Sequence, residues 1–374
     1  MTHNHATQWR FTALDTLFFR ESRPMEAIGG AQLQSVFPPP AATLIGAIRT
    51  AIGEAHQVDW KAYANDDHHP LTVIMGSADS LGPLSFTGPF LMQKKDRLFA
   101  VPLALLHAKN NGVDQFTRLK PSADVTVCDL GAVCLPVKRD ALAGAKPLEQ
   151  AFITAAGLSA FLHDQMPAAN TIQKPCDLFD SEERLGIGRD YAKRTTIDGL
   201  LYQTNHIRPM QDVSIGIVVK GLDCAGLPQQ GTCRLGAEGR MAAWQCEAVQ
   251  TLPPIQFDKK NKNIMLVLLT PARFTQGWLP DGFTQVMTAD QQTVWEGNIH
   301  GVALRLISSV TGKPMREGGW DLVNRSPRTM HSLVPAGSCY FCEVLGGAEA
   351  STLHGQQIGQ DTEYGRGEIA IGHW

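Results

Sequence analysis

The chain has 374 residues, of which 43% are hydrophobic, and its formal net charge is −3. This composition excludes a disordered chain, and the lack of a basic excess argues against a protein that binds nucleic acid through overall charge alone. Eight scattered cysteines do not resemble a disulfide scaffold, and neither a signal core nor a membrane-spanning apolar run is present. We therefore expect a cytoplasmic protein with reduced thiols and no membrane contact.

The first part of the chain has the element order of a ferredoxin-like domain. Apolar residues at helical spacing predict helices over 41–54 and 149–163. Alternating or β-branched residues predict strands over 9–19, 84–92, 98–103, 213–220 and 240–249. Read in chain order, the six elements up to residue 220 give the βαββαβ pattern of that fold, and the strand over 240–249 follows them.

A linker rich in proline, lysine and asparagine is predicted over 252–263. Strands predicted after it over 264–269, 302–307 and 338–344 fit a second, smaller unit of the same kind. The sequence thus predicts an α+β fold with two ferredoxin-like (RRM-type) domains in tandem. Their expected ranges are 1–256, with insertions, and 257–374.

The segment LGIGRDYAKRTTIDGLLYQTNHIRP, residues 185–209, predicts a β-hairpin inserted in the first domain. Asp198-Gly199 is typical of a type I′ turn, and its flanks, 193–197 and 200–204, are strand-prone. Residues 184–208 hold five basic residues, two acidic residues and two tyrosines. Such a hairpin can lie along a phosphate backbone, or its charges can simply protect an exposed edge; the residues alone leave both interpretations open.

The glycine pairs do not match a nucleotide-binding fingerprint. Gly186-x-Gly188 lacks a third glycine, and only four residues follow Gly365-x-Gly367-x-x-Ala370, too few for the helix that would seat a pyrophosphate. We interpret these glycines as positions of tight turns or close backbone approach. No cofactor is expected.

Six segments in chain order resemble the third subunit of type III-B CRISPR effectors (Cmr complexes), a family of the RAMP superfamily. They are LDTLFFRESRP (14–24), FPPPAATLIGAIRTAI (37–52), ERLGIGRD (183–190), DGLLYQTNHIRP (198–209), LGAEGRMA (235–242) and YGRGEIAIGHW (364–374). One departure is Ala237, which stands where a further glycine is expected.

The resemblance implies a subunit of an antiviral ribonucleoprotein with no nuclease activity of its own. Such a subunit would bind the 5′ tag of the CRISPR RNA and contact both the large polymerase-like subunit and the first backbone RAMP subunit. The RNA-binding residues implied by the matched motifs are Arg20, Arg23, Arg49, Gly186, Gly188, Arg189, Lys193, Arg194, Arg208, Gly365, Arg366 and Gly367. Glycines at 365 and 367 would let backbone N–H groups approach phosphates.

The alternative is a RAMP-superfamily endoribonuclease that processes CRISPR RNA. It requires a general acid or base, for which His206 and His300 are candidates, but neither has a supporting constellation in the sequence. No metal site is expected. His163-Asp164 lacks companion ligands, and Cys339-x-x-Cys342 lies on a predicted strand, where the two thiols face opposite ways.

Overall fold

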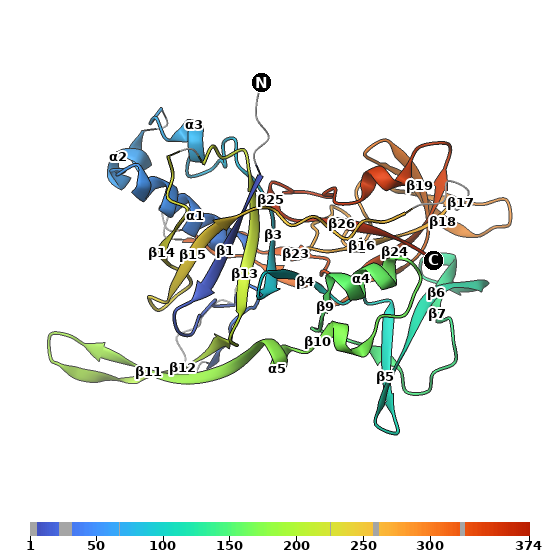
Figure 1. The fold of residues 1–374 in the computed structure, drawn as a ribbon, viewed down its shortest axis with the longest axis horizontal. Helices are drawn as coiled ribbons and strands as arrows, with labels where there is room; N and C mark the ends of the chain where they lie inside the picture. The colour runs from blue at the N-terminus through green and yellow to red at the C-terminus, as the bar shows by residue number, and fades with distance from the viewer. Residues whose placement is uncertain (1–5, 22–31, 67, 225, 257–261, 322–325) are drawn as a thin grey trace. The chain divides into compact units, whose positions relative to one another are not determined.

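The computed structural model describes residues 6–21, 32–66, 68–224, 226–256, 262–321 and 326–374 (Figure 1). Strands dominate this part of the chain, and helices are few. Contacts divide the chain into two compact units, each assembled from three segments. Unit 1 comprises residues 1–95, 176–249 and 316–331, and unit 2 comprises residues 96–175, 250–315 and 332–374.

Unit 1 contains an antiparallel sheet in the order β3-β13-β1-β15-β14. Its strands are β1 (Ala6–Ala13), β3 (Ser85–Gln93), β13 (Val213–Lys220), β14 (Gln230–Arg234) and β15 (Met241–Glu247). Seven of the eight residues of β13 are buried, Ser214 among them, which fits a strand with both faces covered. The central strand of this sheet is β1, which pairs with β13 on one side and β15 on the other.

Helix α1 (Ala41–Ala55) contacts β3 and β14 of this sheet. Its buried residues Leu44, Ile45, Ile48 and Ile52 recur at helical spacing and form the face that packs inward. Two short helices follow, α2 (Trp60–Asn65) and α3 (Thr72–Met75). A separate three-stranded sheet is formed by β11 (Phe179–Asp190), β12 (Thr195–Pro209) and β2 (Gln32–Leu33).

Unit 2 is built on a sheet in the order β17-β18-β19-β24-β16-β26. Its strands are β16 (Asn263–Leu268), β17 (Thr284–Met287), β18 (Thr293–Ile299), β19 (Val302–Val310), β24 (Cys339–Leu345) and β26 (Ile369–His373). Both faces are covered. Met265 and Val267 belong to one apolar cluster, with Leu158 and Phe161 of α4 (Ala155–Leu162), whereas Ile264 belongs to another.

The remaining elements are short or peripheral. In unit 2 they include β4 (Asp96–Ala100), β5 (Leu105–Asn110), β6 (Val113–Cys128), β7 (Gly131–Lys138), β8 (Lys146–Pro147), β9 (Phe152–Thr154), η1 (Ala169–Thr171), β10 (Ile172–Gln173) and η2 (Ala350–Leu353). The others are α5 (Pro175–Leu178), β20 (Met315–Glu317), β21 (Trp320–Asp321), β22 (Ser326–Pro327), β23 (His331–Leu333) and β25 (Tyr364–Gly365).

Two buried arginines stabilise unit 2 from within. Arg97 pairs with Glu368 through both guanidinium nitrogens, and each side chain is 6% exposed. Arg118 is 1% exposed; it donates to Asp164 at 2.6 Å and to the carbonyl oxygen of His373 at 2.9 Å. Buried charges must be paired, and these arginines are paired with groups of their own unit. They are therefore structural.

Several predicted elements are confirmed in place, among them the strand 213–220 and the helix that begins at Ala41. The helix predicted over 149–163 is shorter, because Phe152–Thr154 pairs with β4 as strand β9. The Thr154 hydroxyl caps the helix by accepting from the Gly157 N–H at 3.3 Å. The ranges 1–256 and 257–374 remain a prediction about chain order, and the compact units differ from them at residues 96–175, 250–256 and 316–331.

No helix among the described residues is both long and apolar enough to cross a membrane.

Candidate nucleic-acid interface

The predicted hairpin exists, but it is longer than expected and turns elsewhere. Strands β11 and β12 pair from Phe179↔Pro209 to Asp190↔Thr195, and the connection is the turn 191–194. The distal part extends away from the strands of the unit 1 sheet (Figure 1). Asp198-Gly199 lies inside β12, where the register shifts between Ile187 and Arg189, so the prediction of a type I′ turn at this dipeptide is wrong. Gly199, with φ of 77°, lies in this irregular stretch of the strand.

The tip of the hairpin, residues 189–194, carries exposed positive charge. Arg189, Lys193 and Arg194 are all exposed, and the Tyr191 side chain beside them is 87% exposed. Lys193 lies 3.9 Å from the Asp190 carboxylate, a weak contact for a side chain that is 80% exposed. Within the described part of the chain, Arg189 and Arg194 have no ion-pair partner. The tip therefore combines cationic groups with an aromatic ring, as a single-stranded nucleic acid requires.

Gly186 and Gly188 lie beneath side chains of the opposite strand. A Cβ at Gly186 would come within 2.2 Å of the Tyr202 ring, and a Cβ at Gly188 within 2.7 Å of Leu200. The Tyr202 hydroxyl lies 3.4 Å from the Glu238 carboxylate, whose charge raises the pKa of this tyrosine. The close approach predicted at these glycines is thus made by the chain's own side chains, and their RNA contact remains a prediction.

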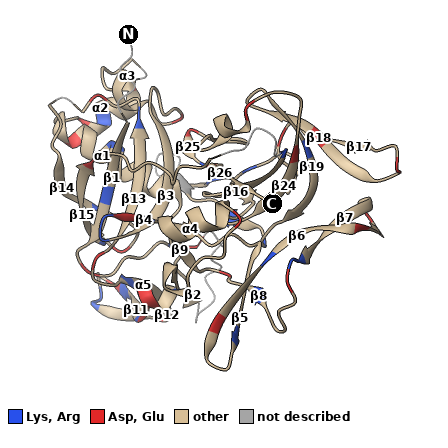
Figure 2. Ribbon diagram, turned by 45° about the vertical axis from the view of Figure 1, so that its right-hand side comes forward, with Lys and Arg blue, Asp and Glu red and all other residues tan. Residues whose placement is uncertain are grey.

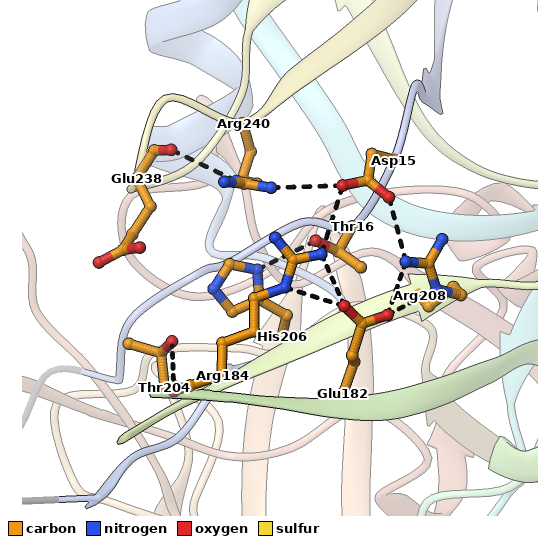
Figure 3. A network of polar contacts seen from close by, with 9 residues as sticks. All are labelled: Asp15, Thr16, Glu182, Arg184, Thr204, His206, Arg208, Glu238 and Arg240. Carbon is orange, nitrogen blue, oxygen red and sulfur yellow. Dashed lines mark hydrogen bonds and ion pairs between the residues drawn. The ribbon is translucent and has the colours of Figure 1, made fainter. Parts of the chain in front are cut away.

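The base of the hairpin is a network of three arginines and two carboxylates (Figure 3). Glu182 of β11 accepts from Arg184 at 2.6 Å and from Arg208 at 2.6 Å. Asp15, in the bend after β1, is reached by Arg184 at 3.3 Å, Arg208 at 3.1 Å and Arg240 at 3.4 Å. Arg208 was a predicted RNA ligand, and in the structure it is engaged by both carboxylates.

Electrostatics keep this network ionised. Hydrogen bonds from Arg184 and Arg208 lower the pKa of Glu182, and those bonds in turn raise the pKa of both arginines. The pKa of Asp15 is lowered first by a hydrogen bond from the Thr16 backbone and then by the same two arginines. Both signs of charge accordingly lie along β11 and β12 (Figure 2). Residues 179–209 contain five basic and five acidic residues. The hairpin as a whole is therefore not basic, and only its tip is.

Other predicted RNA ligands occupy different places in unit 1. Arg49 of α1 is half-buried, donates to the Tyr63 hydroxyl at 2.8 Å and also bonds the Ser77 carbonyl oxygen, so it joins α1 to the segment that holds α2 and α3. Arg20 is exposed and forms an isolated β-bridge with Ser35. Arg23 lies outside the described residues.

The C-terminal glycine loop belongs to unit 2 and is folded into the chain. The Gly365 N–H donates to the Thr362 carbonyl and the Gly367 N–H to the Pro271 carbonyl, both at 2.9 Å. Arg366 donates to Asp361 at 2.7 Å, and Arg273 reaches the same carboxylate at 2.7 Å. The backbone groups that were predicted to meet phosphates thus already have partners.

The rival catalytic and metal candidates are built into the fold. His206 is fully buried, bonds the Thr16 hydroxyl through Nδ1 at 3.0 Å and stacks on Phe18, and burial lowers its pKa. His300 bonds the Gln357 carbonyl oxygen. Asp164 forms ion pairs with Arg118 and Arg139. No group of three potential metal ligands occurs among the residues described.

Cys339 and Cys342 lie in the two apolar clusters on opposite sides of the unit 2 sheet, as the period of a strand predicts. Burial raises the pKa of the Cys339 thiol to about 12 and also raises that of Cys342. Neither thiol is placed or ionised as a ligand of a shared metal requires.

The family of the chain follows from a comparison with protein-family models. Residues 9–374 match the model of the CRISPR-associated protein (Cas_Cmr3) family. The chain belongs to this family. The match spans nearly the whole chain and confirms the resemblance seen in the six motifs. No protein in a search of curated sequences matched.

One solved structure shows a related fold for this member of the Cas_Cmr3 family, and a second is similar over a longer range at a lower score. A chain of the "Cryo-EM structure of the Type III-B Cmr-beta bound to cognate target RNA" has a TM-score of 0.50 at 14% identity, covering 89% of this chain and 86% of that one. A chain of the "Crystal structure of Csm3-Csm4 subcomplex in the type III-A CRISPR-Cas interference complex" has a TM-score of 0.39 at 7% identity, covering 98% and 99%.

Sequence reasoning missed the acidic half of the site. Asp15 and Glu182 are brought to the arginines by the fold, and Asp15 is 169 residues from Arg184 along the chain. A charge count over a wider window would have found Glu182, but no local pattern indicates Asp15. Arg240, which lies in the matched motif 235–242, was also not singled out.

Proposed function

We propose that the chain is a non-catalytic subunit of a type III-B CRISPR RNA-guided effector complex in antiviral defence. In this role it binds the 5′ tag of the CRISPR RNA and bridges the large polymerase-like subunit to a backbone RAMP subunit. Membership of the Cas_Cmr3 family supports the assignment. The observation that carries RNA binding is the hairpin tip, where Arg189 and Arg194 are exposed next to the ring of Tyr191.

The strand orders support a tandem of two ferredoxin-like cores. Strands β1, β3, β13 and β15 are numbered 1 to 4 here in chain order. Their order across the sheet is 2-3-1-4 (β3-β13-β1-β15), and all neighbouring pairs are antiparallel. Strands β16, β19, β24 and β26 repeat this arrangement as β19-β24-β16-β26. The first set ends at Glu247 and the second begins at Asn263, which fits the proposed ranges 1–256 and 257–374.

The expected partners and location follow from the same assignment. The described cysteines are all unpaired, which fits reduced thiols in a cytoplasmic ribonucleoprotein. The exposed cations of the hairpin tip suit contact with RNA.

The experiment that tests the function is purification of the chain with its co-expressed neighbouring subunits, followed by sequencing of the retained RNA. We expect short RNAs that share one 5′ end, because a subunit that binds the tag selects that end. RNA with random 5′ ends, or a complex that lacks this chain, would contradict the proposal.

A second prediction separates this function from an RNA-processing enzyme. The pure protein should leave labelled CRISPR RNA intact, with or without divalent metal, because His206 is fully buried and a substrate phosphate cannot come within hydrogen-bond reach of its ring. Product analysis on a denaturing gel measures this. Cleavage that disappears in His206→Ala but persists in the control His300→Ala would establish the endoribonuclease instead.

A further inference from the structure

Three guanidinium groups converge on the Asp15 carboxylate from separate parts of unit 1 (Figure 3). Arg184 comes from β11, Arg208 from β12, and Arg240 from the turn that precedes β15. Asp15 itself is 51% exposed, so solvent reaches the point where the arginines meet. An exposed cluster of arginines at one point is a binding site for an oxyanion.

The two carboxylates of the network hold the arginines differently. Glu182 belongs to the hairpin and accepts from Arg184 at 2.8 and 2.6 Å, and from Arg208 at 2.7 and 2.6 Å. Asp15 belongs to another segment, and its contacts with the three arginines range from 3.1 to 3.4 Å. Glu182 would therefore keep Arg184 and Arg208 in place if Asp15 moved away. Asp15 is the weaker and more replaceable of the two anions.

A phosphodiester resembles the Asp15 carboxylate in the properties that matter here. Each carries one negative charge and presents two equivalent oxygens to donors. In the network, Arg208 approaches Oδ1, while Arg184 and Arg240 approach Oδ2. Exchange of one anion for the other leaves the local charge unchanged and keeps the three arginines paired.

We propose that Arg184, Arg208 and Arg240 form a phosphodiester-binding position for the RNA backbone, which Asp15 occupies as an internal substitute when RNA is absent. The position lies at the base of the hairpin, whereas the proposed tag contacts lie at its tip, so the RNA backbone would meet the hairpin at both ends. This inference rests on the proposed function. The inference adds to the proposed function a second RNA contact and an intramolecular competitor for that contact.

The test is the binding of a single-stranded CRISPR RNA to the purified protein over a range of salt concentrations. Asp15→Asn removes the competing charge but keeps the size of the side chain. The variant should bind several-fold more tightly, because the three arginines no longer have an internal anion that competes with the RNA backbone. Arg240→Gln should bind more weakly, and its salt slope should flatten by roughly 0.7, the value for one lost phosphate contact on a single strand. The affinity of the double variant should lie between those of the two single variants.

Unchanged or weaker binding by a folded Asp15→Asn variant would overturn the inference. If Asp15→Asn fails to fold, Arg240→Gln decides alone, and an unchanged slope in that variant overturns the inference. Arg240 suits this purpose because it lies outside both the hairpin and its tip. Failure of the proposed function is distinguishable, since the wild-type protein, alone and in the assembled complex, would then show no RNA binding that depends on the tip residues.

Discussion

Replacement of Arg189, Lys193 and Arg194 by alanine is expected to lower the affinity for single-stranded CRISPR RNA and to flatten its salt dependence. These residues place three exposed cations at the hairpin tip, and each phosphate contact that is lost should reduce the slope by roughly 0.7. If all three contact phosphates, the slope falls by about 2. The folded core should be unaffected, because the tip is exposed and no ion pair made by these residues joins it to the unit 1 sheet.

A matched control removes three exposed cations from elsewhere in unit 1, Lys61, Lys94 and Arg234. This control should keep most of the affinity and most of the slope. The competing interpretation makes the hairpin a docking arm for another protein subunit. In that case the tip variant loses the partner in a pull-down while its RNA affinity and salt slope remain at wild-type values.

The substitution Gly367→Val is expected to destabilise unit 2. Gly367 has a φ of 73°, and a Cβ at this position would lie 1.9 Å from the carbonyl oxygen of Ile358. Its N–H also donates to Pro271, so the backbone cannot move aside without loss of that bond. Backbone strain and overpacking each cost about 1–3 kcal/mol, so we expect the free energy of unfolding to fall by about 3 kcal/mol.

Denaturant unfolding measures this difference, with Gly347→Val as its control. A Cβ at Gly347 meets no atom within 4 Å, so this variant should stay within about 0.5 kcal/mol of the wild type. Equal stabilities of the two variants would show that the loop accommodates the larger side chain at position 367 without loss of stability, and would contradict the prediction. The effect of Gly367→Val on folding is therefore expected before any effect on the RNA contact that the sequence predicts for this glycine.

Sequence patterns were most informative where local chemistry decides the structure. The segment 213–220 is mostly apolar, although it contains Ser214 and ends at Lys220, and its β-branched residues favoured the strand that is seen. Helix α1 begins at Ala41, directly after the prolines. The same reasoning misplaced the hairpin turn. Asp190 accepts from the N–H groups of Ala192 at 2.9 Å and Lys193 at 3.1 Å, and this aspartate turn determines the reversal instead of Asp198-Gly199.

The candidate site was predictable only in part, because half of it depends on contacts between distant segments. The tip residues were indicated by their charge together with the family resemblance. Arg208 was indicated in the same way and Arg49 by the resemblance, but the fold pairs Arg208 with Asp15 and Glu182, and Arg49 with Tyr63. A basic residue in a sequence shows that a cation is available. The fold decides whether that cation faces an RNA or a carboxylate of its own chain.

Photo-crosslinking of the assembled complex, with the crosslinked peptides identified by mass spectrometry, tests the central claim most directly. Tyr191 is a suitable reporter, because this residue is 87% exposed and lies between the cationic residues of the tip. The account predicts crosslinks between the peptide that contains Tyr191 and the 5′ tag of the CRISPR RNA, and their loss in Tyr191→Ala. Crosslinks from this peptide to the 3′ end of the RNA, or to a protein subunit with none to RNA, would contradict it.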